Sequence, residues 1–232
     1  MLDASATVQY VLVERAHAGT FKGKSTLAGN AEPVSGATVT ITTPGGTVLL
    51  ATEDPPMGPG AVLGQYRIAL DGYGIARLAA GTYTLSVTTR ESERVTGTTT
   101  LFADALEPIQ SAMQTASPTD TIRVRWPSVA GARSYEVRVM SSPKLDPYVV
   151  FGDSAIAIPA TARTLTNDPV FSSATSATLV VSAVDENYYE YYRGVSDPYA
   201  GSPPSRLEGG LGVFGAIVPL RILRVFLCPN CP

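Results

Sequence analysis

The sequence predicts an all-β protein built from two tandem β-sandwich domains, with at most one short helix. Its 232 residues are enough for two domains of ~100 residues, each with its own core. Apolar and polar residues alternate in many short stretches rich in Thr, Val, Ile and Tyr, which are separated by Gly and Pro. Only 16% of the residues are charged, against ~25% in an average soluble domain, which leaves a surface rich in Thr, Ser and Gly. This composition is typical of secreted β-proteins.

The first half of the chain contains four predicted strands. Residues 38–42 alternate up to a Pro-Gly-Gly turn, and residues 47–51 follow as a hairpin partner. Residues 65–70 and 82–88 show the same alternation. The segment 53–64 contains three prolines and several glycines, which favour a surface loop. Both a binding tip and a plain connector fit this loop.

A change in pattern marks the predicted domain boundary. Residues 104–121 are polar and small, with two prolines and no alternation. We therefore expect a first domain at residues 1–105, a linker at 106–119 and a second domain at 120–232.

The second half opens with two predicted strands, at residues 122–126 and 135–139. Trp126 is the only tryptophan, and it shares one face of its strand with Ile122 and Val124. This spacing favours a buried position between two sheets over a sugar-binding platform.

A strand at residues 177–184 leads into the one predicted helix, near residues 186–193. Asp185 can cap its N-terminus and Gly194 can end it in the left-handed conformation. The tyrosines of this segment would point to most sides of the helix, so that some of them must be exposed. They form a candidate binding surface, made of Tyr188, Tyr189, Tyr191 and Tyr192.

The C-terminal strand, residues 216–227, is apolar on both faces, although a sandwich strand with one wet face should be apolar on one only. Either the chain itself covers the second face, or the strand pairs with or packs against another molecule. The candidate interface residues are Leu220, Ile222, Leu223, Val225, Phe226 and Leu227.

Several stretches resemble known families. Residues 32–41 and 81–87 resemble the carboxypeptidase-regulatory-like sandwich, a transthyretin-type accessory fold that is non-catalytic in its relatives. Residues 120–127, 131–139 and 179–185 resemble the immunoglobulin-like fibronectin type III domain. The glycine-rich block 208–215, together with the preceding tyrosines, is similar to the end of an uncharacterised family of bacterial cell-envelope proteins that joins these two modules and is usually lipoprotein-anchored. The resemblance implies a two-sandwich fold.

Catalytic chemistry finds little support in the sequence. His17 is the only histidine, and no Gly-x-Ser-x-Gly elbow occurs, which argues against a serine hydrolase and against a multi-histidine metal site. The carboxylates show no spacing that singles out a glycosidase pair. Residues 208–215 contain Gly-Gly-x-Gly-x-x-Gly, but Pro219 and β-branched residues follow, so that a bend before the last strand is expected in place of a dinucleotide loop. We expect no enzyme, no cofactor, and neither catalytic nor metal-binding residues.

The two cysteines, Cys228 and Cys231, have the Cys-x-x-Cys spacing without a helix start or further zinc ligands. A local disulfide, an intermolecular bridge and an idle tail all fit them.

These observations predict a non-catalytic protein that acts by binding or assembly, as a self-assembling surface or filament subunit. The alternative is a carbohydrate-binding or accessory module of a surface nutrient-uptake or enzyme complex, in which the tyrosines would stack on a glycan. A net charge of −3 argues against nucleic acid as a partner. No stretch reaches the ~20 apolar residues of a membrane span. We expect an extracytoplasmic protein, on the cell surface or secreted, with its signal removed or absent from this chain.

Overall fold

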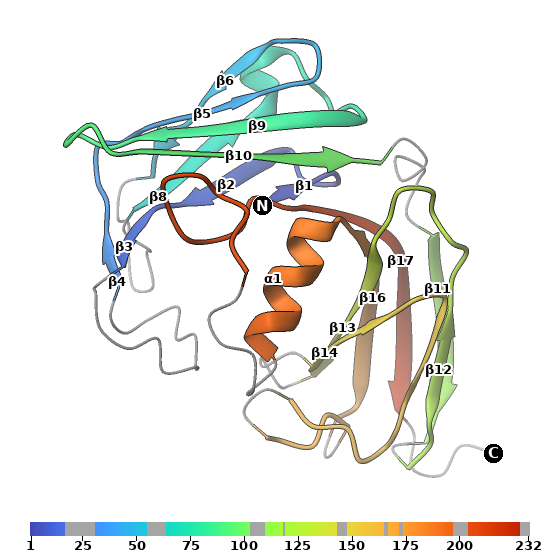
Figure 1. Cartoon of the computed structure of the whole chain (residues 1–232). Coiled ribbons are helices and arrows are strands. Elements are labelled where there is room, and N and C mark those ends of the chain that lie inside the picture. Colours follow the sequence, from blue (N-terminus) through green and yellow to red (C-terminus); the bar gives the residue numbers. More distant parts are fainter. Residues whose placement is uncertain are drawn as a thin grey trace. The chain divides into compact units, whose positions relative to one another are not determined.

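The computed structural model describes residues 1–16, 31–54, 64–102, 110–117, 119–142, 148–164, 167–171, 174–196 and 204–227. The protein is mostly β, with several sheets and one short α-helix among these residues (Figure 1). The chain forms two compact units: unit 1 comprises residues 1–103 and 185–217, and unit 2 comprises residues 104–184 and 218–232. His17, most of the predicted loop 53–64, and both Cys228 and Cys231 lie outside the described residues.

Unit 1 contains three sheets. The order is β10-β9-β5-β6 in the first, β2-β8-β7 in the second and β3-β4 in the third. Their strands are β2 (Val8–Leu12), β3 (Glu14–Ala16), β4 (Ala31–Pro33), β5 (Thr38–Thr42), β6 (Val48–Leu50), β7 (Thr52–Glu53), β8 (Gln65–Ala69), β9 (Gly81–Thr88) and β10 (Arg94–Leu101). A 3₁₀ helix, η1 (Leu70–Tyr73), follows β8, and the α-helix, α1 (Glu186–Ser196), also belongs to this unit.

Alternation along these strands builds the core of unit 1. Every second residue of β5 and β9 is buried, and the same holds for β8. The buried side chains include Val39, Ile41, Leu49, Tyr66, Ile68, Leu70, Leu78, Tyr83, Leu85 and Val87. The predicted strands at 38–42, 65–70 and 82–88 therefore form close to their expected places.

Unit 2 contains two sheets. In the larger sheet, the strands lie in the order β17-β16-β13-β14, and β11 pairs with β17 in parallel; β12 and β15 form a separate two-stranded sheet. The strands are β11 (Gln110–Ala116), β12 (Ile122–Arg125), β13 (Ser134–Ser142), β14 (Tyr148–Gly152), β15 (Ala155–Ile158), β16 (Ser176–Val184) and β17 (Ala216–Leu227). The first two residues of β17 belong to unit 1, where they pair with β1 (Leu2–Asp3).

Trp126 lies in the core of unit 2, as predicted. It is 5% exposed, and its ring lies 5.5 Å from that of Tyr135 on β13. Inward side chains of both sheets are buried around it, among them Ile122, Val124, Val137, Val139, Ile158, Leu179, Val181, Leu223 and Val225.

The two units differ from the predicted division in two places. Residues 185–217 group with residues 1–103, whereas the prediction assigned them to the second domain. Residues 110–116, within the predicted linker, form β11, because the backbone of β17 pairs with them although their side chains show no alternation. That residues 1–105 and 120–232 fold as independent domains remains a prediction.

Candidate binding surfaces

Asp185 fixes the start of α1. Its carboxylate accepts hydrogen bonds from the Tyr188 N–H (2.9 Å), the Ala216 N–H (3.1 Å) and the Thr99 hydroxyl (2.6 Å). The bond from Tyr188 is the N-terminal cap that the sequence predicts. Burial raises the pKa of the Asp185 carboxyl, and these hydrogen bonds act against that rise. Asp185 therefore serves the fold of unit 1 rather than an open site.

Gly215 allows the close approach between the end of the glycine-rich block and α1. A Cβ atom at this position would lie 2.8 Å from the Tyr188 backbone nitrogen and 2.9 Å from an Asp185 carboxylate oxygen. The block 208–215 is an irregular segment before the last strand, as expected, and is not followed by a helix.

The tyrosines of α1 divide into one buried and three half-buried side chains. Tyr188 is 0% exposed, so its place in the predicted binding surface is wrong: its ring packs 4.5 Å from that of Tyr192 inside the fold. Tyr191 meets Tyr192 edge to face at 5.4 Å, and burial raises the pKa of the Tyr191 hydroxyl. The Arg193 guanidinium lies 5.8 Å above the Tyr189 ring. Tyr189, Tyr191 and Tyr192 are the candidates that remain.

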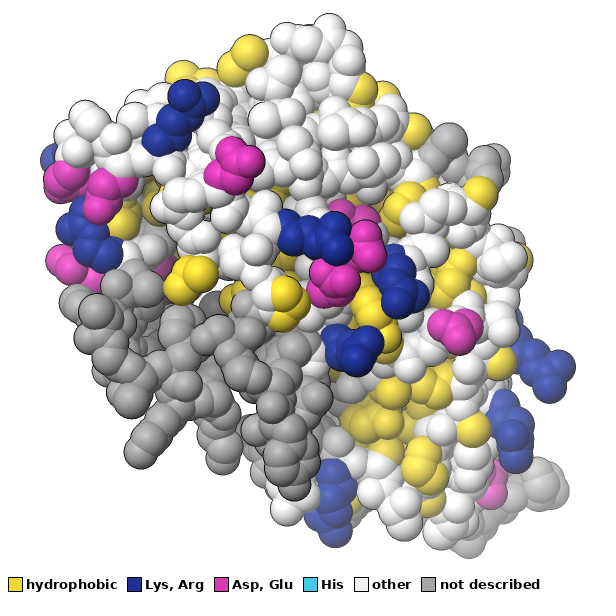
Figure 2. Space-filling model, viewed as in Figure 1, with side chains coloured by type: hydrophobic (Ala, Val, Ile, Leu, Met, Phe, Trp, Pro, Cys, Tyr) yellow, Lys and Arg dark blue, Asp and Glu magenta, His cyan; other side chains and the backbone are white. Residues whose placement is uncertain are grey.

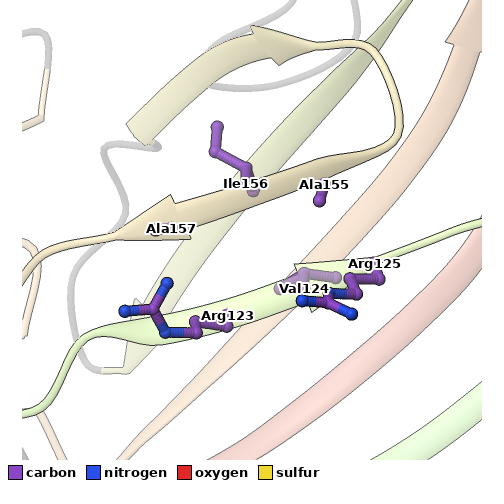
Figure 3. A pocket seen from close by; sticks show the side chains of 6 residues that line it. All are labelled: Arg123, Val124, Arg125, Ala155, Ile156 and Ala157. Carbon is purple, nitrogen blue, oxygen red and sulfur yellow. The ribbon is translucent and has the colours of Figure 1, made fainter.

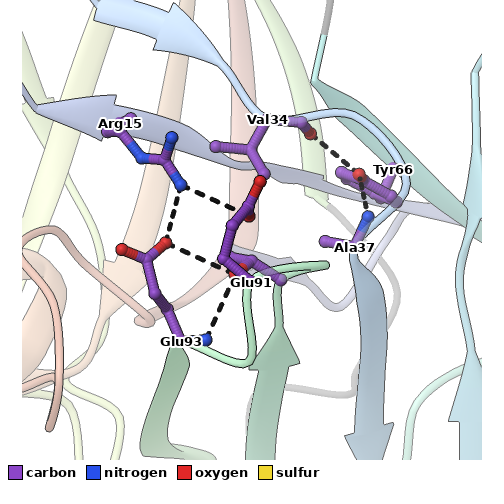
Figure 4. Close-up of polar contacts among 7 residues, drawn as sticks. Arg15, Val34, Ala37, Tyr66, Glu91 and Glu93 are labelled. Carbon is purple, nitrogen blue, oxygen red and sulfur yellow. Dashed lines mark hydrogen bonds and ion pairs between the residues drawn. The ribbon is translucent and has the colours of Figure 1, made fainter.

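The polar contacts around the end of β3 stabilise the fold of unit 1 (Figure 4). The Arg15 guanidinium forms ion pairs with Glu91 at 3.3 Å and Glu93 at 2.8 Å. Nearby, the buried Tyr66 hydroxyl accepts a bond from the Ala37 N–H and donates one to the Val34 carbonyl, both at 2.8 Å. These bonds connect loops of unit 1 to each other.

β17 is an interior strand. The chain itself therefore covers both edges of its backbone, which was one of the two possibilities for the C-terminal segment. It has β16 on one side and β11 on the other, with Ser111 paired to Ile222 and Ala116 to Leu227. The expectation that β17 itself adds to another molecule as an edge strand is therefore wrong, since its hydrogen-bonding groups are used within the chain.

The two faces of β17 differ. Leu223, Val225 and Leu227 are buried, whereas Phe226 is 51% exposed. Leu220 and Ile222 are half-buried. Of the six predicted interface residues, Phe226 is thus the most accessible.

Phe226 belongs to a larger surface of mixed apolar and polar side chains that we call the outer face of unit 2. Met113 on β11 is 72% exposed and pairs with Arg224, two residues from Phe226; Met140 on β13 is 44% exposed and pairs with Thr178 on β16. Each lies on the side of its strand opposite a buried apolar neighbour, namely Ala116 on β11, Val139 on β13 and Val225 on β17. The same side of β13 and β16 also carries the buried Glu136 and Ser182, which pair with each other. The outer face comprises Met113, Thr115, Arg138, Met140, Thr178, Val180, Arg224 and Phe226. Figure 2 shows hydrophobic side chains gathered over the part of unit 2 where Figure 1 places β13, β14 and β16.

A shallow hollow of about 160 Å³ lies on the β12–β15 sheet (Figure 3). Arg123 and Arg125 line it together with Ala155 and Ala157, their partners across the two strands. The hollow forms because two long side chains stand beside two methyl groups. The sequence shows the Arg-x-Arg alternation, but only the strand register brings the alanines beside it.

Within the described parts of the chain, no group of three or more His, Cys, Asp or Glu side chains is placed to hold a metal ion. Of the helices described, none combines the length and the hydropathy needed to cross a bilayer.

Comparisons with known proteins place the chain in a family. No curated protein matches it. A solved structure described as "Ca2+-stabilized adhesin helps an Antarctic bacterium reach out and bind ice" shares 12% identity, with a TM-score of 0.22. That match covers 95% of this chain and 45% of the other, and likeness at this level carries no argument about fold or function. The family described as "Domain of unknown function (DUF4249)" matches residues 2–219, so the chain belongs to the DUF4249 family.

Proposed function

We propose that this chain is a non-catalytic, extracytoplasmic cell-envelope protein that works by binding another protein, a second copy of itself first of all, through the outer face of unit 2. The single observation that carries the proposal is the exposure of three large apolar side chains, Met113, Met140 and Phe226, on one face of one sheet. Large apolar side chains that are exposed together on one face of a sheet mark an interaction site more often than ones scattered singly over a surface.

The proposed architecture is a pair of β-sandwiches, transthyretin-like in unit 1 and fibronectin type III-like in unit 2. In unit 2 this is supported by the contact between Trp126 and Tyr135 and by the burial of the inward side chains of both β12 and β13. In unit 1 it is supported by two sheets whose strands each bury alternate residues, as in β8 and β9.

The non-catalytic assignment is supported by the use of the most buried carboxylates. Asp185 caps α1, and Glu136, which is 3% exposed, forms an ion pair with Arg138 at 3.0 Å. Both groups serve the packing of their own unit.

Sedimentation velocity with the wild type and a Met140→Ser/Phe226→Ser variant tests the proposal. We expect the wild type to associate, and the variant to associate at least about tenfold more weakly, because each buried apolar side chain contributes ~1.5–3 kcal/mol. Both substitutions are at exposed positions, so the thermal midpoint should not change.

Leu211→Ser is the matched control, since Leu211 is 68% exposed but belongs to unit 1. It should associate like the wild type. A wild type that stays monomeric at its highest soluble concentration would contradict self-assembly, and equal weakening by Leu211→Ser would contradict the role of the outer face.

Glycan binding by α1 is the second candidate, favoured by the half-buried rings of Tyr189, Tyr191 and Tyr192. Saturable binding on a glycan array that Tyr191→Ala and Tyr192→Ala abolish, with no effect of Phe226→Ser, would support this alternative over assembly.

A further inference from the structure

The β12–β15 sheet carries two arginines that have no carboxylate partner within ion-pair distance in the described part of the chain. Neither Arg123 nor Arg125 forms an ion pair there, whereas Arg15, Arg67, Arg138 and Arg206 all do. Both unpaired side chains are exposed. A third guanidinium is close by, because Arg221 donates to the Arg125 carbonyl at 2.7 Å.

The register of the two strands shows where their backbone groups point. Val124 pairs with Ile156, and the Trp126 N–H donates to the Ser154 carbonyl (3.0 Å) in the same register. Bonded and non-bonded pairs alternate in an antiparallel ladder, so the pairs of Arg123 and Arg125 are the non-bonded ones. The Arg125 carbonyl confirms this, since it points away from β15 and accepts the bond from Arg221.

The N–H and C=O groups of Ala155 and Ala157 therefore point to the other side of β15, away from β12. Among the described residues β15 pairs with β12 alone, and both alanines are exposed. A Cβ atom at Gly152, the last residue of β14, would lie 3.4 Å from the Ala155 carbonyl oxygen, so the open stretch of this edge is the one at Ala157. This side of β15 offers a row of backbone donors and acceptors that an extended chain can use.

The side chains above this edge match one kind of partner. A strand added beside β15 would lie ~10 Å from β12, two strand spacings away. The alanines between them leave the hollow open, so that long acidic side chains on the added strand can reach the arginines across it (Figure 3). Arg123 and Arg125 are two residues apart, a separation of ~7 Å that carboxylates at alternate positions of a strand reproduce.

We propose that the free edge of β15 binds an extended acidic peptide segment, which adds as a third strand and places carboxylates from alternate residues against Arg123 and Arg125. The site goes beyond the proposed function, because it lies on the β12–β15 sheet rather than on the outer face of the β17–β16–β13 sheet. Backbone bonds to Ala157 would align the peptide with β15, and the two arginines would supply the preference for acidic side chains.

Binding of three blocked heptapeptides, followed by the amide NMR shifts of unit 2, tests this proposal. The first is a threonine peptide with glutamate at its third and fifth positions. The second has glutamine at both positions, and the third has its two glutamates next to each other. We expect the first to bind at least threefold more tightly than the others, because neighbouring side chains of a strand point to opposite faces. The largest shifts should be at Ala155 and Ala157.

Two changes to the protein separate strand addition from simple ion pairing. Arg123→Gln with Arg125→Gln should abolish the preference for the first peptide, whereas Arg94→Gln, an exposed arginine of unit 1, should not. Ala157→Pro should abolish binding of all three peptides, because it removes a backbone N–H donor that points to the free edge. The substitution removes no hydrogen bond to β12. Ala157→Ser is its matched control and should bind like the wild type.

Several results would overturn the proposal. These are equal binding of the three peptides, no binding by the wild type, unchanged binding by Ala157→Pro, and inorganic sulfate producing the same shifts at the same concentration as the first peptide. The outcome is independent of the sedimentation experiment, since none of these substitutions lies on the outer face.

Discussion

Units 1 and 2 differ in how completely their buried polar atoms are hydrogen-bonded. In unit 1, Arg15, Arg67 and Arg206 each form ion pairs with carboxylates, and in unit 2 Arg138 pairs with Glu136. The buried hydroxyls of Tyr66 and Tyr83 are bonded to backbone carbonyls. In unit 2, by contrast, three buried polar atoms have no partner among the described residues: Trp126 Nε1, Arg138 Nε and Ser141 Oγ.

The contrast indicates where each unit obtains its stability. Both units have hydrogen bonds that connect loops to strands, such as the bond from the Val129 N–H to the Tyr135 hydroxyl in unit 2. Unit 2 also has buried polar atoms without a described partner beside its apolar core around Trp126, so apolar packing has the larger share there. Unit 2 also has two exposed arginines, Arg123 and Arg125, that form no ion pair with the residues that the structure describes.

The largest expected effect tests the core of unit 2. Trp126→Ala should lower the free energy of unfolding of unit 2 by ~3–5 kcal/mol, because the cavity it leaves removes the contact with Tyr135. Hydrogen exchange measured by mass spectrometry should show lost protection in residues 110–184, with unit 1 unchanged. Trp126→Phe, which keeps a ring there, should lose much less. A loss of protection shared equally by both units would contradict their separate stability.

A smaller effect tests the dependence of unit 1 on polar bonds. Tyr66→Phe should cost ~1–3 kcal/mol in denaturant unfolding, because it leaves the Ala37 N–H and the Val34 carbonyl without their partner.

Tyr73→Phe is a close control for that change. Its hydroxyl makes the same pair of bonds, to the N–H (2.7 Å) and carbonyl (3.1 Å) of Leu50, but the side chain is 39% exposed. Water can replace those bonds, so the cost should be smaller. Equal costs for the two variants would show that burial of Tyr66 does not matter.

The smallest effect concerns pH. Burial raises the pKa of Asp185 in the folded state, so the folded protein holds this proton more tightly than the unfolded chain does. Its contribution to stability is therefore greatest at low pH and decreases as the pH rises from the unfolded pKa of ~3.9 through the raised folded value. The Met1 amino group and Arg206 interact electrostatically with this carboxyl.

Asp185→Asn removes the titration. The unfolding free energy of the wild type, minus that of the variant, should decrease with rising pH above ~4, as measured by denaturant unfolding. A difference that increases with pH would show that the hydrogen bonds outweigh burial.

Strands whose inward residues are apolar could be predicted from the sequence, and β5, β9 and α1 lie close to their expected places. β10 was not predicted because its inward positions include Gly97 and Thr99. Gly97 makes room for the Leu207 side chain, and Thr99 donates to Asp185. Such positions are explained by residues more than eighty positions away, which no local pattern contains.

The candidate surfaces were predictable only in part. Phe226 was among the predicted interface residues, but Met113 belongs to a segment expected to be a linker, and it joins the outer face only through the pairing of β11 with β17. Tyr188 is buried because the chain near Gly215 packs against the start of α1, a contact that the spacing of the tyrosines does not reveal.

The interleaved composition of the two units has a consequence for synthesis on the ribosome. Residues 1–103 leave the ribosome first, but residues 185–217, which complete unit 1, emerge only after nearly all of unit 2 has been made. At ~5–20 residues per second, the first segment waits on the order of 10 s for its missing part. During that time Thr99 and the inward side of β10 have no partner from residues 185–215. The nascent chain thus needs protection from aggregation until residues 185–217 have emerged.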